Sequence, residues 1–223
     1  MDARHARQSG LVDSGIFDVP VTVIGAGGIG SFTTLALAKI GFKNIKVFDD
    51  DSIEVHNLGN QFYRIKDLSK LKVAALAEIV QDFEDVVIEA KAYKYSMQNS
   101  KEMEGLVISA VDSMQARKLV YDSIKNNKAV HGFIDGRMGG NQLEVYTVNM
   151  TNKADKVAYE KTLWSDDQTA DIPCTQKAVM YNVLTIASWI VNQARLLLSK
   201  KGFNRELILD LENMLLVQSG EVR

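Results

Sequence analysis

The first feature that could do chemistry is a run of glycines after a short apolar stretch. Gly25-Ala-Gly27-Gly28-Ile-Gly30 matches the pattern G-x-G-x-x-G, directly between a predicted strand and a predicted helix. Gly25 allows a tight turn, and Gly30 allows the helix to pack closely on the strand. Gly27 and Gly28 let a phosphate approach the backbone, where the helix N-terminus offers N–H donors. The pattern predicts a nucleotide-binding turn; the alternative is a glycine-rich turn used only for packing.

Carboxylates and a lysine follow, at places where later elements begin or end. Asp49 ends the second predicted strand, where a carboxylate accepts hydrogen bonds from ribose hydroxyls. With the glycine turn alone, this would indicate an NAD-dependent oxidoreductase. Lys72 opens a predicted helix and Asp112 follows a later strand. Hydride transfer does not need these two groups, whereas ATP needs a cation to offset its charge and a carboxylate to hold Mg²⁺. The residue types therefore favour an ATP site.

Short apolar runs alternate with amphipathic stretches in the part of the chain that positions these residues. We predict strands at residues 21–24, 45–48, 86–88, 106–111 and 129–134. We predict helices at residues 28–40, 68–83 and 113–127. Alternating strands and helices are typical of a parallel sheet with right-handed crossovers. The carboxyl ends of such strands meet at one edge, which would bring the glycines and carboxylates together.

The pattern changes after Gly136. Residues 142–148 alternate apolar and polar side chains, as an antiparallel strand does, and residues 206–211 and 214–217 suggest a closing hairpin. Between them lie a polar stretch, 151–172, and an apolar helix, 177–199, predicted to serve as core and dimer surface. We therefore predict a Rossmann-like α/β fold: a mostly parallel sheet with helices on both faces and antiparallel strands in the C-terminal half. We expect one domain, 1–223, with residues 151–173 as a crossover loop.

Composition excludes several other classes of protein. The 223 residues are 46% hydrophobic and carry a formal net charge of −2, which gives no general electrostatic reason to bind nucleic acid or an anionic membrane. A single cysteine excludes an internal disulfide and a multi-cysteine zinc site. The first ten residues lack the apolar core of a signal peptide, and polar residues interrupt the most apolar helix. We expect a soluble, cytoplasmic protein with neither nucleic-acid nor membrane partners.

Taken together, the motifs resemble the ThiF/MoeB/HesA family, the E1-like adenylyltransferases that include the adenylating domain of ubiquitin-activating (E1) enzymes. The resemblance covers nearly the whole chain in order and spacing. The matching residues are Arg4-His-Ala-Arg7-Gln8, Gly25 to Gly30, Asp49-x-Asp51, Asn57-Leu58-x-x-Gln61, Lys72, Asp112-Ser113-x-x-x-Arg117 and Cys174.

This resemblance implies a role for each matching residue. The glycines would lie against the phosphates of ATP, and Asp49 would bind the ribose. The remaining contacts to ATP would come from Asn57, Gln61, Lys72 and Ser113, with Asp51 supporting the site or the metal. Asp112 would ligate Mg²⁺. Arg7 would reach across a homodimer into the partner's site.

The implied reaction is attack of a carboxylate on the α-phosphate of ATP, which gives an acyl-adenylate and pyrophosphate. The substrate would be the C-terminus of a small ubiquitin-like or sulfur-carrier protein. A carboxylate is already a nucleophile, so positioning and charge stabilisation suffice. Cys174 precedes a predicted helix, where the helix N-terminus favours thiolate. In the family this position takes the acyl group or sulfur; the alternative is a cysteine that only packs.

The chain departs from the family pattern at Asn60, where relatives usually have arginine. Arg64, four residues on, is a candidate substitute. The departure keeps a second hypothesis open, an inactive nucleotide-binding or scaffold partner subunit; the NAD-dependent oxidoreductase is the third. Arg137 ends a predicted strand, and we interpret it as a surface salt bridge, with contact to a substrate tail as the alternative.

Overall fold

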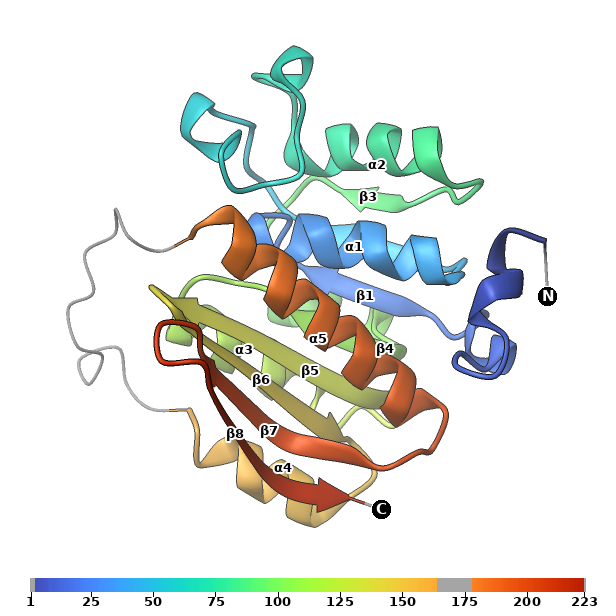
Figure 1. Ribbon diagram of the computed structural model, residues 1–223, viewed down its shortest axis with the longest axis vertical. Helices are drawn as coiled ribbons and strands as arrows, with labels where there is room; N and C mark the ends of the chain where they lie inside the picture. The colour runs from blue at the N-terminus through green and yellow to red at the C-terminus, as the bar shows by residue number, and fades with distance from the viewer. Residues whose placement is uncertain (1–2, 164–177, 223) are drawn as a thin grey trace.

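An eight-stranded sheet organises the computed structural model, which describes residues 3–163 and 178–222 (Figure 1). In space the strands follow the order β3-β2-β1-β4-β5-β6-β7-β8. The strands from β3 to β5 pair in parallel, and those from β5 to β8 pair antiparallel. Their bounds are β1 Val21–Ile24, β2 Ile45–Phe48, β3 Glu89–Lys91, β4 Gly105–Ser109, β5 Val130–Gly139, β6 Gln142–Asn149, β7 Phe203–Asp210 and β8 Leu215–Val222.

Helices cover both faces of this sheet. Their bounds are α1 Gly28–Ile40, α2 Lys72–Phe83, α3 Met114–Ile124, α4 Lys153–Glu160 and α5 Met180–Leu198. Helices α1, α2 and α5 lie on one face, and α3 and α4 on the other (Figure 1). The predicted Rossmann-like architecture, with antiparallel strands in the C-terminal half, is confirmed. Within the described ranges, no helix combines the length and the apolar character that a membrane crossing requires.

The core is divided into two apolar clusters by the sheet. One contains Val23 and Ile108 of the sheet with Leu37 of α1 and Ile190 of α5. The other packs Phe133 of β5 against residues of α3 and α4. Every residue of β1 and β4 is buried, which is expected of parallel strands covered on both faces. The continuous apolar runs in the sequence reflect this double burial.

Several predicted bounds differ from the structure, most clearly the start of α2 and the position of β3. Helix α2 begins at Lys72, not at residue 68, because the backbone of Ser69 and Lys70 bonds to Ile53 instead. Ser69 also has a positive φ of 67°, which interrupts any helix. Strand β3 lies at Glu89–Lys91, three residues later than predicted, and Val87 in the predicted strand is 78% exposed.

The stretch predicted as a crossover loop contains a helix in its first part. Asn152 caps α4 by accepting a hydrogen bond from the Ala154 N–H at 2.8 Å. The helix buries Asp155 and Tyr159 against the sheet, although half of its residues are charged. A helix of eight residues is too short for its pattern of apolar residues to be recognised in the sequence. Residues 164–173 of the predicted loop lie outside the described residues.

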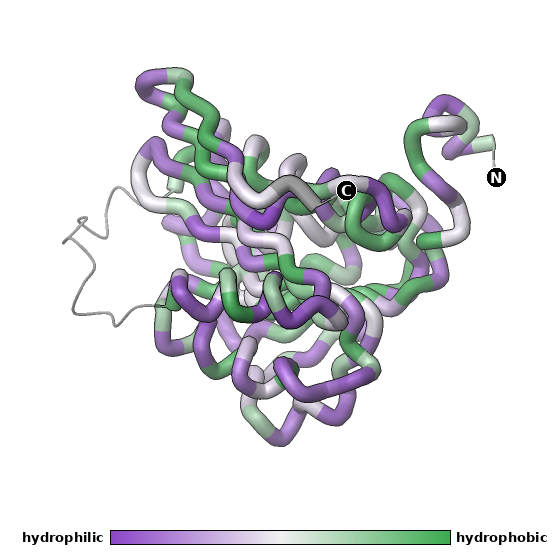
Figure 2. The backbone as a smooth tube through the Cα atoms, turned by 90° about the horizontal axis from the view of Figure 1, so that it is seen from below, coloured by the Kyte–Doolittle hydropathy of each residue, from purple (hydrophilic) through white to green (hydrophobic). Residues whose placement is uncertain are grey.

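The N-terminal segment lies at one side of the molecule in both views (Figures 1 and 2). It forms a short 3₁₀ helix, Ala3–Gln8, and the Gln8 side chain donates a hydrogen bond to the Lys39 carbonyl in the last turn of α1. Helix α1 has 13 residues, so its first residue is about 20 Å from its last. The segment therefore lies near the end of α1 opposite the glycine turn.

Arg137 is buried, so the predicted surface salt bridge is wrong. Its Nε donates to Asp135 at 2.7 Å, and its guanidinium lies 4.2 Å from the centre of the Tyr146 ring. Arg117 of α3 also donates to Asp135, at 3.2 Å, and so does the Tyr159 hydroxyl, at 3.0 Å. Asp135 is fully buried, and its charge is compensated by both arginines. This buried cluster joins α3 and α4 to β5.

We predict that Asp135→Asn lowers the free energy of unfolding by about 3–5 kcal/mol, because it leaves two buried guanidinium groups without their shared carboxylate. Chemical denaturation of the purified chain measures this change. Asp122→Asn is the matched control: it removes a partly exposed ion pair with Lys125 in the same region and should cost under about 1 kcal/mol. Equal, small losses in both variants would contradict a structural role for the Asp135 cluster.

Candidate nucleotide-binding site

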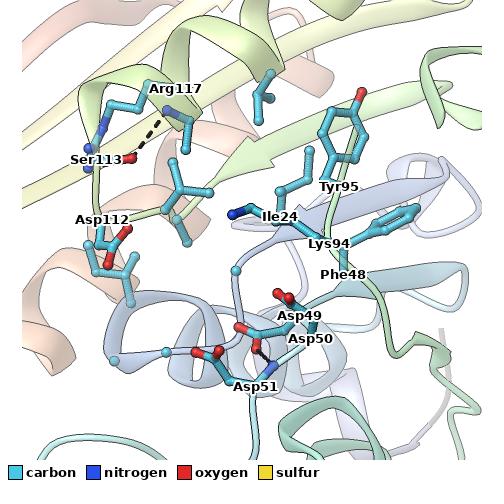
Figure 3. Close-up of a pocket in the computed structure, with 18 of the residues that line it drawn as sticks. Ile24, Phe48, Asp49, Asp50, Asp51, Lys94, Tyr95, Asp112, Ser113 and Arg117 are labelled. Atoms are coloured by element: carbon cyan, nitrogen blue, oxygen red, sulfur yellow. Dashed lines mark hydrogen bonds between the residues drawn. The ribbon is translucent and has the colours of Figure 1, made fainter. Parts of the chain in front are cut away.

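A cavity of about 690 Å³ lies at the carboxyl ends of β1, β2 and β4. Residues from the glycine turn, the end of β2, the start of α3 and the segment after β3 line it. In Figure 3 Asp49 and Asp51 lie on one side of the hollow, and Asp112 with Ser113 on another. A nucleotide-sized molecule fits a cavity of this volume. The edge predicted from strand order is therefore where the candidate residues gather.

The glycine turn brings α1 to the end of β1 with little room to spare. Gly25 has a φ of 97°, and a Cβ there would lie 2.6 Å from the Ala110 carbonyl oxygen. A Cβ on Gly30 would clash with the Gly25 carbonyl oxygen, which explains the third glycine of the motif. Gly27 and Gly28 line the cavity, and α1 begins at Gly28. The helix N-terminus is therefore presented to the hollow, an arrangement that suits an anion.

Asp49 joins the end of β2 to the glycine turn. Its Oδ2 accepts a hydrogen bond from the Ala26 N–H at 2.7 Å, and its Oδ1 accepts one from the Asp51 N–H at 2.9 Å. Burial raises the pKa of Asp49, while these N–H donors and the Lys72 ammonium act in the opposite direction and stabilise the ionised form. The carboxylate also lines the cavity and retains lone pairs for ribose hydroxyls.

Lys72, at the start of α2, is buried beside the acidic residues that follow β2. Its Nζ donates to Asp51 Oδ2 at 2.6 Å and lies 4.0 Å from Asp49 Oδ1. One carboxylate oxygen from each of Asp49, Asp50 and Asp51 lies within 4.8 Å of the others, so Lys72 offsets concentrated negative charge. An ammonium group has three N–H donors, which leaves Lys72 capacity for a ligand in the cavity that it lines.

Asp112 and Ser113 stand at the junction of β4 and α3. Ser113 caps α3 by accepting a hydrogen bond from the Ala116 N–H at 3.2 Å. One turn further, Arg117 bonds to Asp135 and to the Gly136 carbonyl, which fixes α3 on β5. The Asp112 carboxylate is exposed to the cavity and makes neither a hydrogen bond nor an ion pair within residues 3–163 and 178–222. It is therefore available to a cation or a ligand.

The Asn-Leu motif divides into structural and cavity-lining residues. Asn57 is buried, and its side-chain oxygen accepts a hydrogen bond from the Glu54 N–H at 2.9 Å. It is not among the residues that line the cavity. Asn60 and Gln61 do line it, and one buried oxygen of each side-chain amide has no partner in the described chain. These amides would gain hydrogen bonds from a polar ligand.

Arg64, the candidate substitute for the family's arginine, forms its hydrogen bonds outside the cavity. It donates to Asp67 at 2.6 Å and to Asp82 at 2.7 Å, and it does not line the cavity. The Arg64 hydrogen bond lowers the pKa of Asp67 to about 2, so this pair persists over the physiological pH range. The arginine fixes the 3₁₀ turn at Ile65–Asp67 instead of contacting the cavity.

Lys94 and Tyr95 line the cavity but were missed in the sequence. They follow β3, and Figure 3 shows the Lys94 side chain extending into the hollow beside Ile24. Lys94 has no ion-pair partner among residues 3–163 and 178–222. The signal was positional, since residues just after a parallel strand reach this edge. Because β3 was predicted three residues too early, Lys94 and Tyr95 were not recognised as the residues that follow it.

Two predicted residues lie apart from the cavity or beyond the described chain. Arg7 is exposed in the N-terminal 3₁₀ helix, near the end of α1 opposite the glycine turn. It therefore does not contribute to the cavity of its own chain. Cys174 lies outside the described residues.

Part of the chain is similar in sequence to known activating enzymes. The catalytic subunit of the NEDD8-activating enzyme E1 from Arabidopsis thaliana is 34% identical over 138 residues. The SUMO-activating enzyme subunit uba-2 from Caenorhabditis elegans is 32% identical over 134 residues. Each match covers 54% of this chain but only 30% and 21%, respectively, of the relative.

A similar fold occurs in the crystal structure of E. coli MccB with ATP, with a TM-score of 0.76 at 15% identity. That comparison covers 100% of this chain and 73% of the MccB chain. A model of the ThiF family matches residues 9–216, which include the glycine turn, Asp49, Lys72 and Asp112. By this match over most of its length, the chain belongs to the ThiF family.

Proposed function

We propose that this protein is an ATP-dependent adenylyltransferase whose substrate is the C-terminal carboxylate of a small ubiquitin-like or sulfur-carrier protein. The observation that carries this proposal is the cavity itself. The glycine turn and the N-terminus of α1 line it, and so does Asp49, a carboxylate placed to bind a ribose. Lys72 and Asp112 line it from two other elements. Family membership and relatives named as activating enzymes for NEDD8 and SUMO support the choice of reaction and substrate class.

Each part of the nucleotide, from the ribose to the phosphates, has a proposed set of contacts. Asp49 accepts hydrogen bonds from the ribose, and the N–H groups at Gly27 and Gly28 face the phosphates. Lys72 neutralises phosphate charge, with Asp51 holding its ammonium group in place. Gln61 and Ser113 supply further polar contacts, since both line the cavity. Asn57 acts indirectly, by fixing the loop that presents Gln61.

A magnesium ion fits the cavity at Asp112. Its exposed carboxylate has no cationic partner in the described part of the chain, and carboxylate oxygen is a preferred ligand of Mg²⁺. When bound with ATP, the ion would supply positive charge beside the phosphates. Ser113 and Arg117 hold Asp112 in position through the start of α3.

The reaction needs little more than this arrangement. A carboxylate oxygen of the substrate forms a bond to the α-phosphorus, and the bond from that phosphorus to the bridging oxygen breaks. Pyrophosphate leaves with the electron pair, and no proton is transferred. The residues of the chain therefore act by aligning the two reactants and by stabilising negative charge.

The protein is further proposed to act in the cytoplasm as a homodimer in which Arg7 enters the partner's cavity. The position of Arg7 supports this part of the proposal. Arg7 lies near the end of α1 that is remote from the glycine turn, too far from the cavity of its own chain to contact a ligand there. If Arg7 contacts a nucleotide, that nucleotide must therefore be bound in the cavity of another chain.

The second candidate, an inactive nucleotide-binding partner subunit, is favoured by Asn60. Its side chain donates a hydrogen bond to the Ala178 carbonyl at 3.4 Å, where an arginine would offer a charge. ATP binding without pyrophosphate exchange, with every carrier tested, would identify this function. The oxidoreductase hypothesis rests on the glycine turn and Asp49 alone, and no other described residue that lines the cavity supports it.

ATP–pyrophosphate exchange tests the reaction. With carrier proteins that end in Gly-Gly, the wild-type chain should catalyse exchange, and Asp112→Asn and Lys72→Ala should each lower its rate about 100-fold through lost charge stabilisation. Asp122→Asn, on α3 but outside the cavity, is the control and should retain the wild-type rate. Wild-type exchange in both cavity variants would refute the site, and no exchange by the wild type would refute the activity.

Cys174 is proposed to take the acyl group from the adenylate, forming a thioester and releasing AMP. We predict that Cys174→Ala retains pyrophosphate exchange but loses the thiol-sensitive conjugate between carrier and enzyme seen on a non-reducing gel. Exchange survives because adenylation precedes the transfer. A conjugate that persists in Cys174→Ala would exclude this role, since the chain has one cysteine.

A further inference from the structure

The hydroxyl of Tyr63 contacts the backbone of the glycine turn, although Tyr63 does not line the cavity. It donates a hydrogen bond to the Ala26 carbonyl oxygen at 2.6 Å. Ala26 is fully buried and Tyr63 is 8% exposed, so no water competes for this bond. Tyr63 is not among the residues that line the cavity, and any effect on a ligand is therefore indirect.

The bond has a directional consequence for the next residue. The Ala26 carbonyl and the Gly27 N–H belong to one planar peptide unit, and in a trans peptide these two groups point in opposite directions. Within the described ranges there is no cis peptide bond. Tyr63 holds the carbonyl toward the protein interior, so the Gly27 N–H is turned toward the cavity that Gly27 lines.

The Gly27 N–H has no partner within residues 3–163 and 178–222, which leaves it free for a ligand. The other side of Ala26 is also fixed, because its N–H donates to Asp49. Tyr63 is held in turn by its neighbour, since the Phe62 N–H donates to the Ser31 hydroxyl of α1 at 3.0 Å. Ala26 is therefore held by hydrogen bonds at both its N–H and its carbonyl, and the carbonyl bond fixes the peptide unit that carries the Gly27 N–H.

We propose that Tyr63 is a positioning residue that aims the Gly27 N–H at the phosphates of the bound nucleotide. This inference rests on the proposed ATP site and adds a residue to it. Burial and the charges of Asp49 and Asp51 raise the pKa of the Tyr63 phenol, so the hydroxyl stays protonated and remains a donor at all physiological pH values.

Tyr63→Phe tests the proposal because it removes the hydroxyl and keeps the buried ring. Calorimetric titration with ATP·Mg²⁺ should show a dissociation constant raised about three- to tenfold, the usual range for one net hydrogen bond. Adenosine has the same base and ribose but no phosphate, so its dissociation constant should not change. Amide hydrogen exchange at Gly27 should become faster as the peptide loses its restraint.

Tyr121→Phe is the matched control, because this buried tyrosine donates to residues of α4 and lies outside the cavity. It should leave both ligands and the Gly27 amide unchanged. Three results overturn the inference: unchanged ATP binding in Tyr63→Phe, equal weakening of ATP and adenosine, or unchanged exchange at Gly27. The proposed function fails separately, if the wild-type chain binds no ATP.

Discussion

The hydrogen bond between the Ala26 N–H and the Asp49 carboxylate links the two strand ends on which the cavity is built. Asp49 directly follows β2, and Ala26 lies in the turn from β1 to α1. Gly25 and Gly30 permit this turn, because any side chain at either position would meet backbone. The carboxylate therefore fixes the glycine turn while also facing the cavity. One group contributes both to the shape of the glycine turn and to the polar lining of the cavity.

The wall of the cavity that contains Asp112 is held in place by the buried ionic cluster around Asp135. Arg117 connects α3 to Asp135 and the Gly136 carbonyl, so the start of α3 keeps Asp112 at the edge of the cavity. Arg137 binds the same carboxylate and donates to Thr162 just after α4. Such a cluster is costly to desolvate, and it is tolerated here because every charge is paired and hydrogen-bonded. Stability and site geometry are thus coupled through β5.

Local signals explain which parts were predictable from sequence. Short apolar runs, the glycines and Asp49 identified the parallel strands and the edge where they meet, because these signals depend on neighbouring residues. Other contacts depend on partners that only folding brings together. They are the bond of buried Arg137 to Asp135, the bond of Arg64 to Asp67 and the bond of Tyr63 to Ala26. Lys94 and Tyr95 were missed because weak, exposed β3 was placed too early. Helix α4 was missed because only two of its residues are buried.

Calorimetric titration of the wild-type chain with ATP·Mg²⁺ and, separately, with NAD⁺ tests the central claim most directly. The glycine turn and Asp49 are common to sites for both ligands, whereas Lys72 and Asp112 suit only the triphosphate and its metal ion. We predict one ATP bound per chain, with affinity that falls when Mg²⁺ is omitted, and no measurable binding of NAD⁺. Binding of NAD⁺ without binding of ATP would contradict the account.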